Sequence, residues 1–531
     1  MIQHIKRLLG IGKPDPSRGN SIVVNVEKLE RRVALLEDGV LEEYTVEREG
    51  DQNIVGGIFK GRVKNIEPGL KAMFVDIGLD KNAFLHFWDA IPAALDGGLE
   101  EIQREGSNKK KQQKKITSKD IPDIYPIGSE IVIQVSKGPI GTKGPRVTTN
   151  ISLAGRYLVL MPFTEQFGIS RKIEDPKERA RLRKIVQKLS VPEGMGIIMR
   201  TIAQGTRARH FVRDLAMLLE QWDEIEARRA NNPAPVCIFQ EPGLIERTAR
   251  DFLTDEIDQV MCDDAETTEM IRNIAGKISR RAKRRVHYMP SAGGQPIFER
   301  IHIQKQIDEA FSRQVWLPCG GYIVIDETEA LIAIDVNTGR NRGSKDVDKM
   351  ILETNVEAAV EVARQLRLRN IGGLVVIDLI DMRHRKDQQT VYKAIKDRLK
   401  KDKAKTQVLQ ISPIGLMEMT RQRLNESLRD SMYEPCPYCQ GRARVKTPMT
   451  MSVEIQRRLN TVIQKHRDSV GDIIVIVNSD VLNRFKSEDA KLLVELERTH
   501  SGRLIFRSDP TLNRERFAII DAATEKTIDQ G

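Results

Sequence analysis

Two apolar segments of the sequence each end in acidic residues, and these acids are the side chains best suited to chemistry. The first segment runs over residues 330–340 (ALIAIDVNTGR) and the second over residues 372–381 (GGLVVIDLID). Because side chains alternate between the two faces of a strand, Asp335 and Asn337 share one face of the first. Asp378 closes the apolar run of the second. The long helical pattern between the segments would make the strands parallel neighbours, with their acids at one edge.

These two carboxylates predict a site for a hard divalent cation. Magnesium prefers oxygen ligands in an octahedron, keeps several waters, and is usually held by one or two carboxylates together with substrate phosphate. Phosphodiester chemistry is therefore the leading hypothesis, with Asp335 and Asp378 as magnesium ligands and Asn337 orienting the ion or the attacking water. Asp381 is interpreted as a helix-start or supporting residue. The alternative is that the strand-end aspartates only cap the helices that follow them.

A second candidate metal site is the pair Cys436 and Cys439, in the sequence CPYC followed by Gly441. The spacing is that of one metal knuckle, half of a four-ligand zinc site. No second cysteine pair exists in the sequence, so two chains would share each zinc ion, unless His384 or His466 completes the site within one chain. CPYC also resembles the glutaredoxin redox motif, but that motif begins a helix after a strand, whereas here a linker rich in helix breakers precedes the helix.

Composition and charge narrow the class of protein. A chain of 531 residues is long enough for three or more domains. A formal net charge of +11 suits a polyanionic partner such as nucleic acid. The five cysteines form no disulfide framework, which predicts a reducing compartment and, by default, the cytoplasm. No apolar run approaches the roughly 20 residues that cross a bilayer, so we expect no integral membrane segment.

Short glycine-punctuated strands over residues 56–150 predict a small β-barrel of the OB type. Phe74 and Phe84 lie in strand patterns beside several lysines and arginines, a mixture of stacking surface and cations that suits single-stranded nucleic acid. Both phenylalanines could instead belong to the barrel core. Residues 96–123, with KKKQQKK at 109–115, interrupt the barrel and are predicted to be a disordered basic loop that buries no core.

The remainder of the chain alternates strand and helix patterns, which predicts an α/β fold. Asp38-Gly39 indicates a two-residue hairpin near the start, and residues 1–19 are expected to be a flexible arm. The basic run from Arg280 to Arg285 is either a solvated helix face or a track for nucleic acid. Residues 409–412 are predicted to form a strand. A long helix is predicted over residues 208–228, with Val212, Leu215, Leu219 and Trp222 facing inward.

Four motifs resemble those of the ribonuclease E/G family, in the same order. They are IDVNTGR at 334–340, RQLRLR at 364–369, VIDLIDM at 376–382 and CPYC at 436–439. The resemblance extends from about residue 20 to the C-terminus and is closer to the short ribonuclease G form. It implies a multidomain α/β fold with an inserted OB barrel. The implied parts are an RNase H-like subdomain in two pieces (20–55 and 246–313), an RNA-binding barrel of the ribosomal S-one type (56–150), a 5′-sensor (151–245), a deoxyribonuclease-I-like catalytic subdomain (314–432), a Zn-link (433–446) and a small C-terminal α/β domain (447–531).

The resemblance also implies a function. It points to a magnesium-dependent endoribonuclease that cuts single-stranded RNA in mRNA decay and in the processing of rRNA and tRNA precursors, leaving 5′-phosphate and 3′-hydroxyl ends. It implies a homodimer through shared zinc, with dimers pairing into tetramers. Lys405 stands where the family commonly has a basic residue near the cleaved strand. The implied barrel contacts with RNA are Phe74, Phe84 and Lys143. The implied sensor, through which a 5′-monophosphate stimulates cleavage, comprises Gly155, Val159, Arg171, Lys172, Arg200 and Thr201.

Two other functions remain open on the sequence. A noncatalytic RNA-binding assembly factor would use the barrel and sensor beside an inactive nuclease fold, and the intact acid pair argues against it. A deoxyribonuclease would use the same metal chemistry, and only the resemblance favours RNA.

Overall fold

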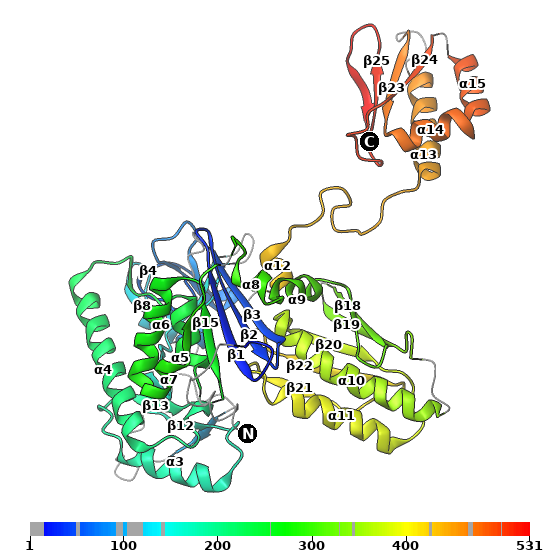
Figure 1. Cartoon of the computed structure of the whole chain (residues 1–531). Coiled ribbons are helices and arrows are strands. Elements are labelled where there is room, and N and C mark those ends of the chain that lie inside the picture. Colours follow the sequence, from blue (N-terminus) through cyan, green and yellow to red (C-terminus); the bar gives the residue numbers. More distant parts are fainter. Residues whose placement is uncertain are drawn as a thin grey trace. The chain divides into compact units, whose positions relative to one another are not determined.

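The fold is that of a computed structural model, which describes residues 15–48, 54–91, 99–102, 120–139, 144–254, 256–291, 293–328, 330–341, 346–423, 427–465, 471–500 and 502–530. The chain divides into two compact units, Met1–Ser431 and Met432–Gly531. Within the described residues the first unit holds four sheets and the second holds one (Figure 1). The chain is therefore a multidomain α/β protein. Most of the predicted N-terminal arm, Lys143 and His466 lie outside the described residues.

The first sheet joins the N-terminal strands to a segment more than 200 residues away. The hairpin between β2 and β3 turns at Asp38 and Gly39, whose φ angles of 48° and 83° are those that a two-residue hairpin turn requires. Strand β1 pairs in parallel with β15. The sheet order is β16-β15-β1-β2-β3, with β1 Asn20–Val26, β2 Glu30–Glu37, β3 Val40–Arg48, β15 Gln259–Cys262 and β16 Val286–Tyr288. Its helices are α5 Leu244–Phe252, α6 Ala265–Ile278, α7 Arg280–Arg284, α8 Ile297–Arg300 and α9 Ile303–Ala310.

The second sheet closes into a five-stranded, OB-like barrel, as predicted. Strand β4 pairs with β5 along one part of its length and with β8 along another, which closes the barrel. The barrel strands are β4 Ile58–Glu67, β5 Ala72–Asp76, β6 Ala83–His86, β8 Glu130–Lys137 and β9 Arg146–Thr148. A sixth strand, β14 (Val236–Phe239), adds to β4 from a distant part of the chain.

The predicted insert in the barrel is ordered at both ends, so the expectation of an unstructured loop that buries no core is wrong there. Strand β7 (Leu99–Glu101) pairs with β12, and Ile102 is buried in the core beside it. At the other end Ile121, the first residue of the short helix α2 (Ile121–Ile124), is buried in the barrel core. Apolar residues at the ends of the polar run account for this order. Residues 103–119, with the lysine-rich run, lie outside the described residues.

The third sheet lies in the predicted sensor, here called the sensor segment (residues 151–245). Its order is β10-β11-β13-β12-β7, with β10 Leu153–Ala154, β11 Leu158–Met161, β12 Phe167–Ser170 and β13 Gly196–Met199. Two helices complete it, α3 (Pro176–Lys188) and α4 (Ala208–Asn231). The inward prediction for Val212 is wrong, because this side chain is 58% exposed. The buried side chains of α4 are Phe211, Leu215, Leu218, Trp222 and Ile225.

The fourth sheet lies in the predicted catalytic subdomain, here called the catalytic segment (residues 314–432). Two long helices, α10 (Val347–Leu368) and α11 (Arg385–Leu399), share its hydrophobic core. The predicted strand at residues 409–412 is wrong, since β21 ends at Val408 and the chain turns before β22. The order is β17-β18-β19-β20-β22-β21, with β17 Gln314–Trp316, β18 Tyr322–Glu327, β19 Leu331–Asn337, β20 Gly373–Asp378, β21 Thr406–Val408 and β22 Leu416–Arg421. Helix α12 (Leu428–Met432) follows.

The second unit is a small α/β domain with its own core. Its helices are α13 (Pro448–Lys465), α14 (Ser479–Ser487) and α15 (Ala490–Thr499). Its sheet has the order β24-β23-β25-β26, with β23 Ile473–Val477, β24 Leu504–Ser508, β25 Phe517–Asp521 and β26 Thr527–Gln530. Across the described parts of both units, none of the helices has the length and apolar composition needed to cross a membrane.

Candidate active site

The two predicted acids face each other on neighbouring strands. Strands β19 and β20 are parallel, and their register places Asp335 directly opposite Asp378. Adjacent strands lie about 4.8 Å apart, so the two carboxylates leave the same face of the sheet side by side. Asn337, two residues further along β19, donates from Nδ2 to Oδ2 of Asp335 at 2.8 Å. The structure thus brings all three predicted residues together.

The alternating burial of β19 explains why these polar side chains share a face. Ile332, Ile334 and Val336 are buried against the helices, while Asp335 is exposed on the opposite face. The same alternation in β20 buries Val375 and leaves Asp378 exposed. The acids therefore lie on an open sheet face, which a flexible polymer can approach.

One residue that supports this site was missed by sequence reasoning. Asn355 of α10 is fully buried, donates from Nδ2 to the carbonyl of Ile380 at 2.8 Å and accepts from the Ile380 N–H at 3.1 Å. These bonds hold the chain immediately after Asp378. A buried asparagine must satisfy its amide, so an asparagine on the apolar face of a predicted helix was the available signal.

The donor set of this site fits magnesium. Two carboxylates and one amide are the kind of protein ligation that magnesium accepts, because it keeps several waters and takes further oxygens from a substrate. A zinc site would usually need three or four protein ligands, most of them histidine nitrogen or cysteine sulfur. Within the part of the chain that the structure describes, no cluster of three or more histidine, cysteine, aspartate or glutamate side chains is arranged to hold a metal. Asp335 and Asp378 are thus the candidate magnesium ligands.

The cysteine pair forms a tight turn in the second unit. Backbone N–H groups of Cys439 and Tyr438 donate toward the Cys436 sulfur and lower the pKa of its thiol. Gln440 and Gly441 have φ angles of 50° and 82°, and the Gln440 N–H donates to the carbonyl of Cys436 at 2.7 Å. N–H groups directed at a thiolate are what a metal-binding knuckle needs, since the thiolate is the metal ligand.

The knuckle is fixed to the small C-terminal domain. Asn513 donates from Nδ2 to the carbonyl of Tyr438 at 2.5 Å, and Glu515 accepts from the Lys446 N–H at 2.7 Å. Arg442 also pairs with Glu515. Of the two histidines considered as intrachain ligands, His384 precedes α11 in the first unit, 4.0 Å from Asp348.

On the barrel, Phe74 and Phe84 form a half-buried aromatic pair outside the core. They are cross-strand partners of β5 and β6, with ring centroids 5.8 Å apart. Both rings are only half-buried, whereas the barrel core contains Phe59 and Phe87. His86 lies beside Phe84, with centroids 6.4 Å apart. The core alternative for the two predicted residues is therefore wrong.

In the sensor segment two acceptors hold the Arg200 guanidinium in place. Its Nη1 donates to the carbonyl of Gly155 at 2.6 Å and lies 2.7 Å from Oδ1 of Asp251. Burial would raise the pKa of Asp251, but Arg200 and Arg250 outweigh burial and hold that pKa below its usual value. Thr201, the next residue, is exposed. Arg200 is thus a fixed cation beside an accessible hydroxyl.

Gly155 lies in the turn between β10 and β11, against a carboxylate. A Cβ at this position would come within 2.8 Å of Oδ2 of Asp214, so any larger residue would require the Asp214 side chain to shift. Asp214 accepts from the N–H groups of Tyr157 at 2.8 Å and of the following leucine at 2.9 Å. Val159 is half-buried on β11, opposite Ala154. This turn places the carbonyl that Arg200 uses.

Lys172 contacts the catalytic segment. Its Nζ donates to the carbonyls of Asp402 at 2.7 Å and Lys403 at 3.0 Å. Burial lowers the pKa of Lys172. Arg171, its neighbour, is exposed. Of the predicted sensor cations, Lys172 therefore links two segments of the first unit.

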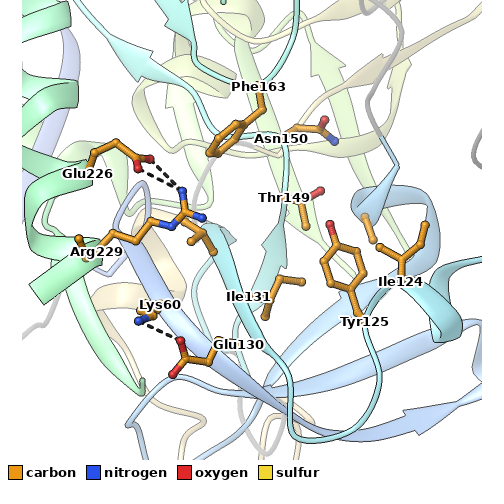
Figure 2. A pocket seen from close by; sticks show the side chains of 13 residues that line it. Lys60, Ile124, Tyr125, Glu130, Ile131, Thr149, Asn150, Phe163, Glu226 and Arg229 are labelled. Atoms are coloured by element: carbon orange, nitrogen blue, oxygen red, sulfur yellow. Dashed lines mark hydrogen bonds and ion pairs between the residues drawn. The ribbon is translucent and has the colours of Figure 1, made fainter. Parts of the chain in front are cut away.

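A separate pocket lies between the barrel and α4, and none of the predicted site residues that the structure describes lines it. It has a volume of about 750 Å³, and Tyr125 and Phe163 line it (Figure 2). Its charges are paired within the pocket: Lys60 lies 2.9 Å from Glu130, and Arg229 lies 3.1 Å from Glu226. Its two carboxylates, Glu130 and Glu226, are used in these ion pairs, and the pocket is not assigned a role in catalysis.

Fold and site define a multidomain α/β protein with an OB-like barrel and a paired-carboxylate site on an open sheet. The model of the ribonuclease E/G family matches residues 152–424. Ribonuclease G of Escherichia coli (strain K12) is 37% identical over 500 residues, which cover 94% of this chain and 99% of that protein. Ribonuclease G of Haemophilus influenzae is 36% identical over 94% of this chain and 99% of its own length. Ribonuclease E of Escherichia coli (strain K12) is 37% identical over 86% of this chain and 42% of its own length. The chain belongs to the ribonuclease E/G family.

Proposed function

We propose that this chain is a magnesium-dependent endoribonuclease specific for single-stranded RNA, with Asp335 and Asp378 as the magnesium ligands. Its class follows from membership of the family. The observation that supports the catalytic assignment is the register of β19 and β20, which sets the two aspartates opposite each other on an open face.

Each residue of the site has a defined task in this reaction. Magnesium, when bound, supplies charge stabilisation at the scissile phosphate and a water of lowered pKa. Asp335 and Asp378 would hold the ion through their carboxylate oxygens. Asn337 fixes the orientation of Asp335 through its 2.8 Å hydrogen bond and keeps its own amide oxygen for a water. Asn355 holds the chain that follows Asp378.

RNA recognition is assigned to the barrel and the sensor segment. The rings of Phe74 and Phe84, on the outside of the barrel, would stack on bases. Arg200 and Thr201 would bind a 5′-monophosphate, and the pre-positioned guanidinium supports this role because little side-chain freedom is lost on binding. The products would carry 5′-phosphate and 3′-hydroxyl ends. Precursors of rRNA and tRNA, together with mRNA, are the proposed substrates in the cytoplasm.

The remaining parts of the proposal concern the assembly. We also propose that the first sheet is RNase H-like, that the catalytic segment is deoxyribonuclease-I-like and that residues 433–446 form a Zn-link. Cys436 and Cys439 of two chains would share one zinc ion, and the resulting dimers would pair into tetramers. The knuckle geometry around Cys436 supports this half-site.

The test compares a fluorescent oligonucleotide made as RNA and as DNA, with magnesium or with a chelator. We expect cleavage of RNA only, and only with magnesium. Asp335→Asn and Asp378→Asn should each slow cleavage more than about a hundredfold, because each removes a metal ligand. RNA affinity, measured by fluorescence anisotropy, should stay near the wild-type value.

Asp326→Asn is the matched control, because Asp326 is an aspartate of the same sheet that pairs with Arg313 at 2.5 Å. It should leave cleavage unchanged. RNA binding by the wild-type chain without cleavage would favour the noncatalytic assembly factor. Equal cleavage of DNA would favour a deoxyribonuclease.

A further inference from the structure

Two aromatic side chains, Trp316 and Tyr322, lie in line with Asn337 across the sheet. Strand register sets Tyr322 of β18 opposite Asn337 of β19, and Trp316 of β17 opposite Tyr322. Directly paired residues in a sheet point to the same face. Trp316, Tyr322 and Asn337 therefore lie in one row across three strands, on the open face that also carries Asp335.

The two rings of the aromatic pair contact each other, and the tryptophan is open to solvent. The rings of Trp316 and Tyr322 have centroids 5.3 Å apart in an edge-to-face arrangement. The Arg340 guanidinium lies 5.2 Å from the centre of the Trp316 ring. Trp316 is nevertheless 52% exposed. The row thus presents a large aromatic surface with a cation beside it.

Local backbone packing holds this arrangement. A Cβ at Gly339 would come within 2.6 Å of the Gly320 carbonyl and 3.1 Å of the Tyr322 ring. The Arg340 N–H donates to the same Gly320 carbonyl at 2.9 Å. The loop after β19 therefore lies directly against the tyrosine, and this contact places Arg340 beside Trp316.

The row ends close to the metal site. Two strand spacings of about 4.8 Å separate Trp316 from Asn337, so the tryptophan is about 10 Å away across the sheet. If a phosphate were bound between Asp335 and Asp378, the base of a nearby nucleotide could reach Trp316. Exposed tryptophan and arginine together are the side chains that stack on bases without reading their sequence.

We propose that Trp316, with Arg340, is a base-stacking subsite for a nucleotide of single-stranded RNA one or two positions from the scissile phosphate. This inference rests on the proposed function and adds a positioning residue to it. Stacking there would hold the strand so that the scissile phosphate lies at the two aspartates. Tyr322 supports the indole edge-on.

The test is a scan with abasic RNA. A set of oligonucleotides with one cleavage site carries a single abasic nucleotide at each position within three of the scissile phosphate. With wild-type protein, we expect one position to raise KM by roughly five- to a hundredfold, the value of one stacked base, while kcat changes little. With Trp316→Leu, intact RNA should show this higher KM, and the abasic substitution at that position should not raise KM further.

Two variants separate stacking from a structural role. Trp316→Leu keeps an apolar side chain but removes the aromatic ring. Trp316→Phe keeps a smaller ring that can stack, so its KM should be close to the wild-type value. Phe163→Leu is the matched control, because Phe163 is 48% exposed and packs edge-to-face on Trp222 at 5.4 Å. It should behave as wild type.

The subsite is overturned if Trp316→Leu cleaves intact RNA with the wild-type KM, or if the abasic penalty is the same in this variant as in wild type. It is also overturned if no abasic position within two nucleotides of the cleaved bond raises KM. Failure of the proposed function has a different signature, because the wild-type chain would then not cut intact RNA with magnesium at all.

Discussion

At the scale of single residues, Arg200, the proposed phosphate-binding group, is already held in position by its own chain. The carbonyl of Gly155 and the carboxylate of Asp251 hold its guanidinium in one position. Both contacts involve the same nitrogen, Nη1. A phosphate is a suitable acceptor for an arginine fork.

The prediction at this scale is that Arg200→Ala removes the preference for a 5′-monophosphate. A charge-assisted contact is worth about 1.5–3 kcal/mol, so wild type should prefer monophosphorylated RNA by roughly ten- to a hundredfold, mainly in KM. RNA with a 5′-hydroxyl should be cut by the variant at close to the wild-type rate, because internal entry through the barrel remains. Cleavage rates on the two substrates measure this.

Arg229→Ala is the control. Arg229 also lies in the sensor segment, near the C-terminal end of α4, where it pairs with Glu226 at 3.1 Å. It should keep the monophosphate preference. Equal slowing of both substrates by Arg200→Ala would contradict the sensor assignment.

At the scale of elements, arginines fasten the helices and strands around the active sheet. In the motif at 364–369, Arg364 donates to the carbonyl of Leu41 at 2.6 Å and Arg367 pairs with the buried Glu42 of β3. Helix α10 is thereby tied to the first sheet. This part of the family motif therefore has a structural role, which its sequence did not reveal.

A buried ion pair has a similar role on β22. The Arg421 guanidinium contacts the Asp402 carboxylate at 2.7 and 3.1 Å, and the two side chains are 2% and 3% exposed. The carbonyl of Asp402 also accepts from Lys172. The catalytic segment and the sensor segment therefore meet at this loop.

We predict that Asp402→Ala lowers the local unfolding free energy of β20 and β22 by about 3–5 kcal/mol, because it leaves a buried guanidinium unpaired. Hydrogen exchange of these strands, followed by mass spectrometry, measures this quantity in the full chain. Asp326→Ala removes the exposed pair with Arg313 in the same sheet and should cost at most about 1 kcal/mol. Equal effects of the two substitutions would show that burial does not set the strength of the pair.

At the scale of the whole molecule, the second unit carries both the cysteine knuckle and a small domain that anchors it. Two thiolates leave a tetrahedral zinc ion with two open positions. In the proposed assembly, a second knuckle from another chain would fill both positions. Zinc and dimerisation are therefore expected to be linked.

The prediction is that the wild-type chain binds one zinc ion per two chains and is at least dimeric. Cys436→Ser combined with Cys439→Ser should remove the zinc and weaken the dimer. Elemental analysis and sedimentation measure the two properties. Cys319→Ser, which changes a cysteine of the first unit, should alter neither. One zinc ion per chain, or a monomeric wild type, would rule out sharing.

Much of the site could be predicted because it depends on near neighbours in the chain. Alternation along β19 placed Asp335 and Asn337 on one face, and Asp38-Gly39 specified its hairpin. Local patterns failed where tertiary contacts decide. Val212 lies at the edge of the apolar stripe of α4 and is exposed, and residues 409–412 turn instead of extending β21.

Contacts between distant segments were decided only by the tertiary structure. The pairing of β1 with β15, the addition of β7 to the sensor sheet and the contact of Lys172 with Asp402 join residues that no local pattern relates. The row of Trp316, Tyr322 and Asn337 is of the same kind, since strand register places its members. The sequence by itself determined which side chains of β19 share a face and which chemistry they offer. Packing of one segment against another determined which of them meet, because register follows from burial of the whole face and not from any single residue.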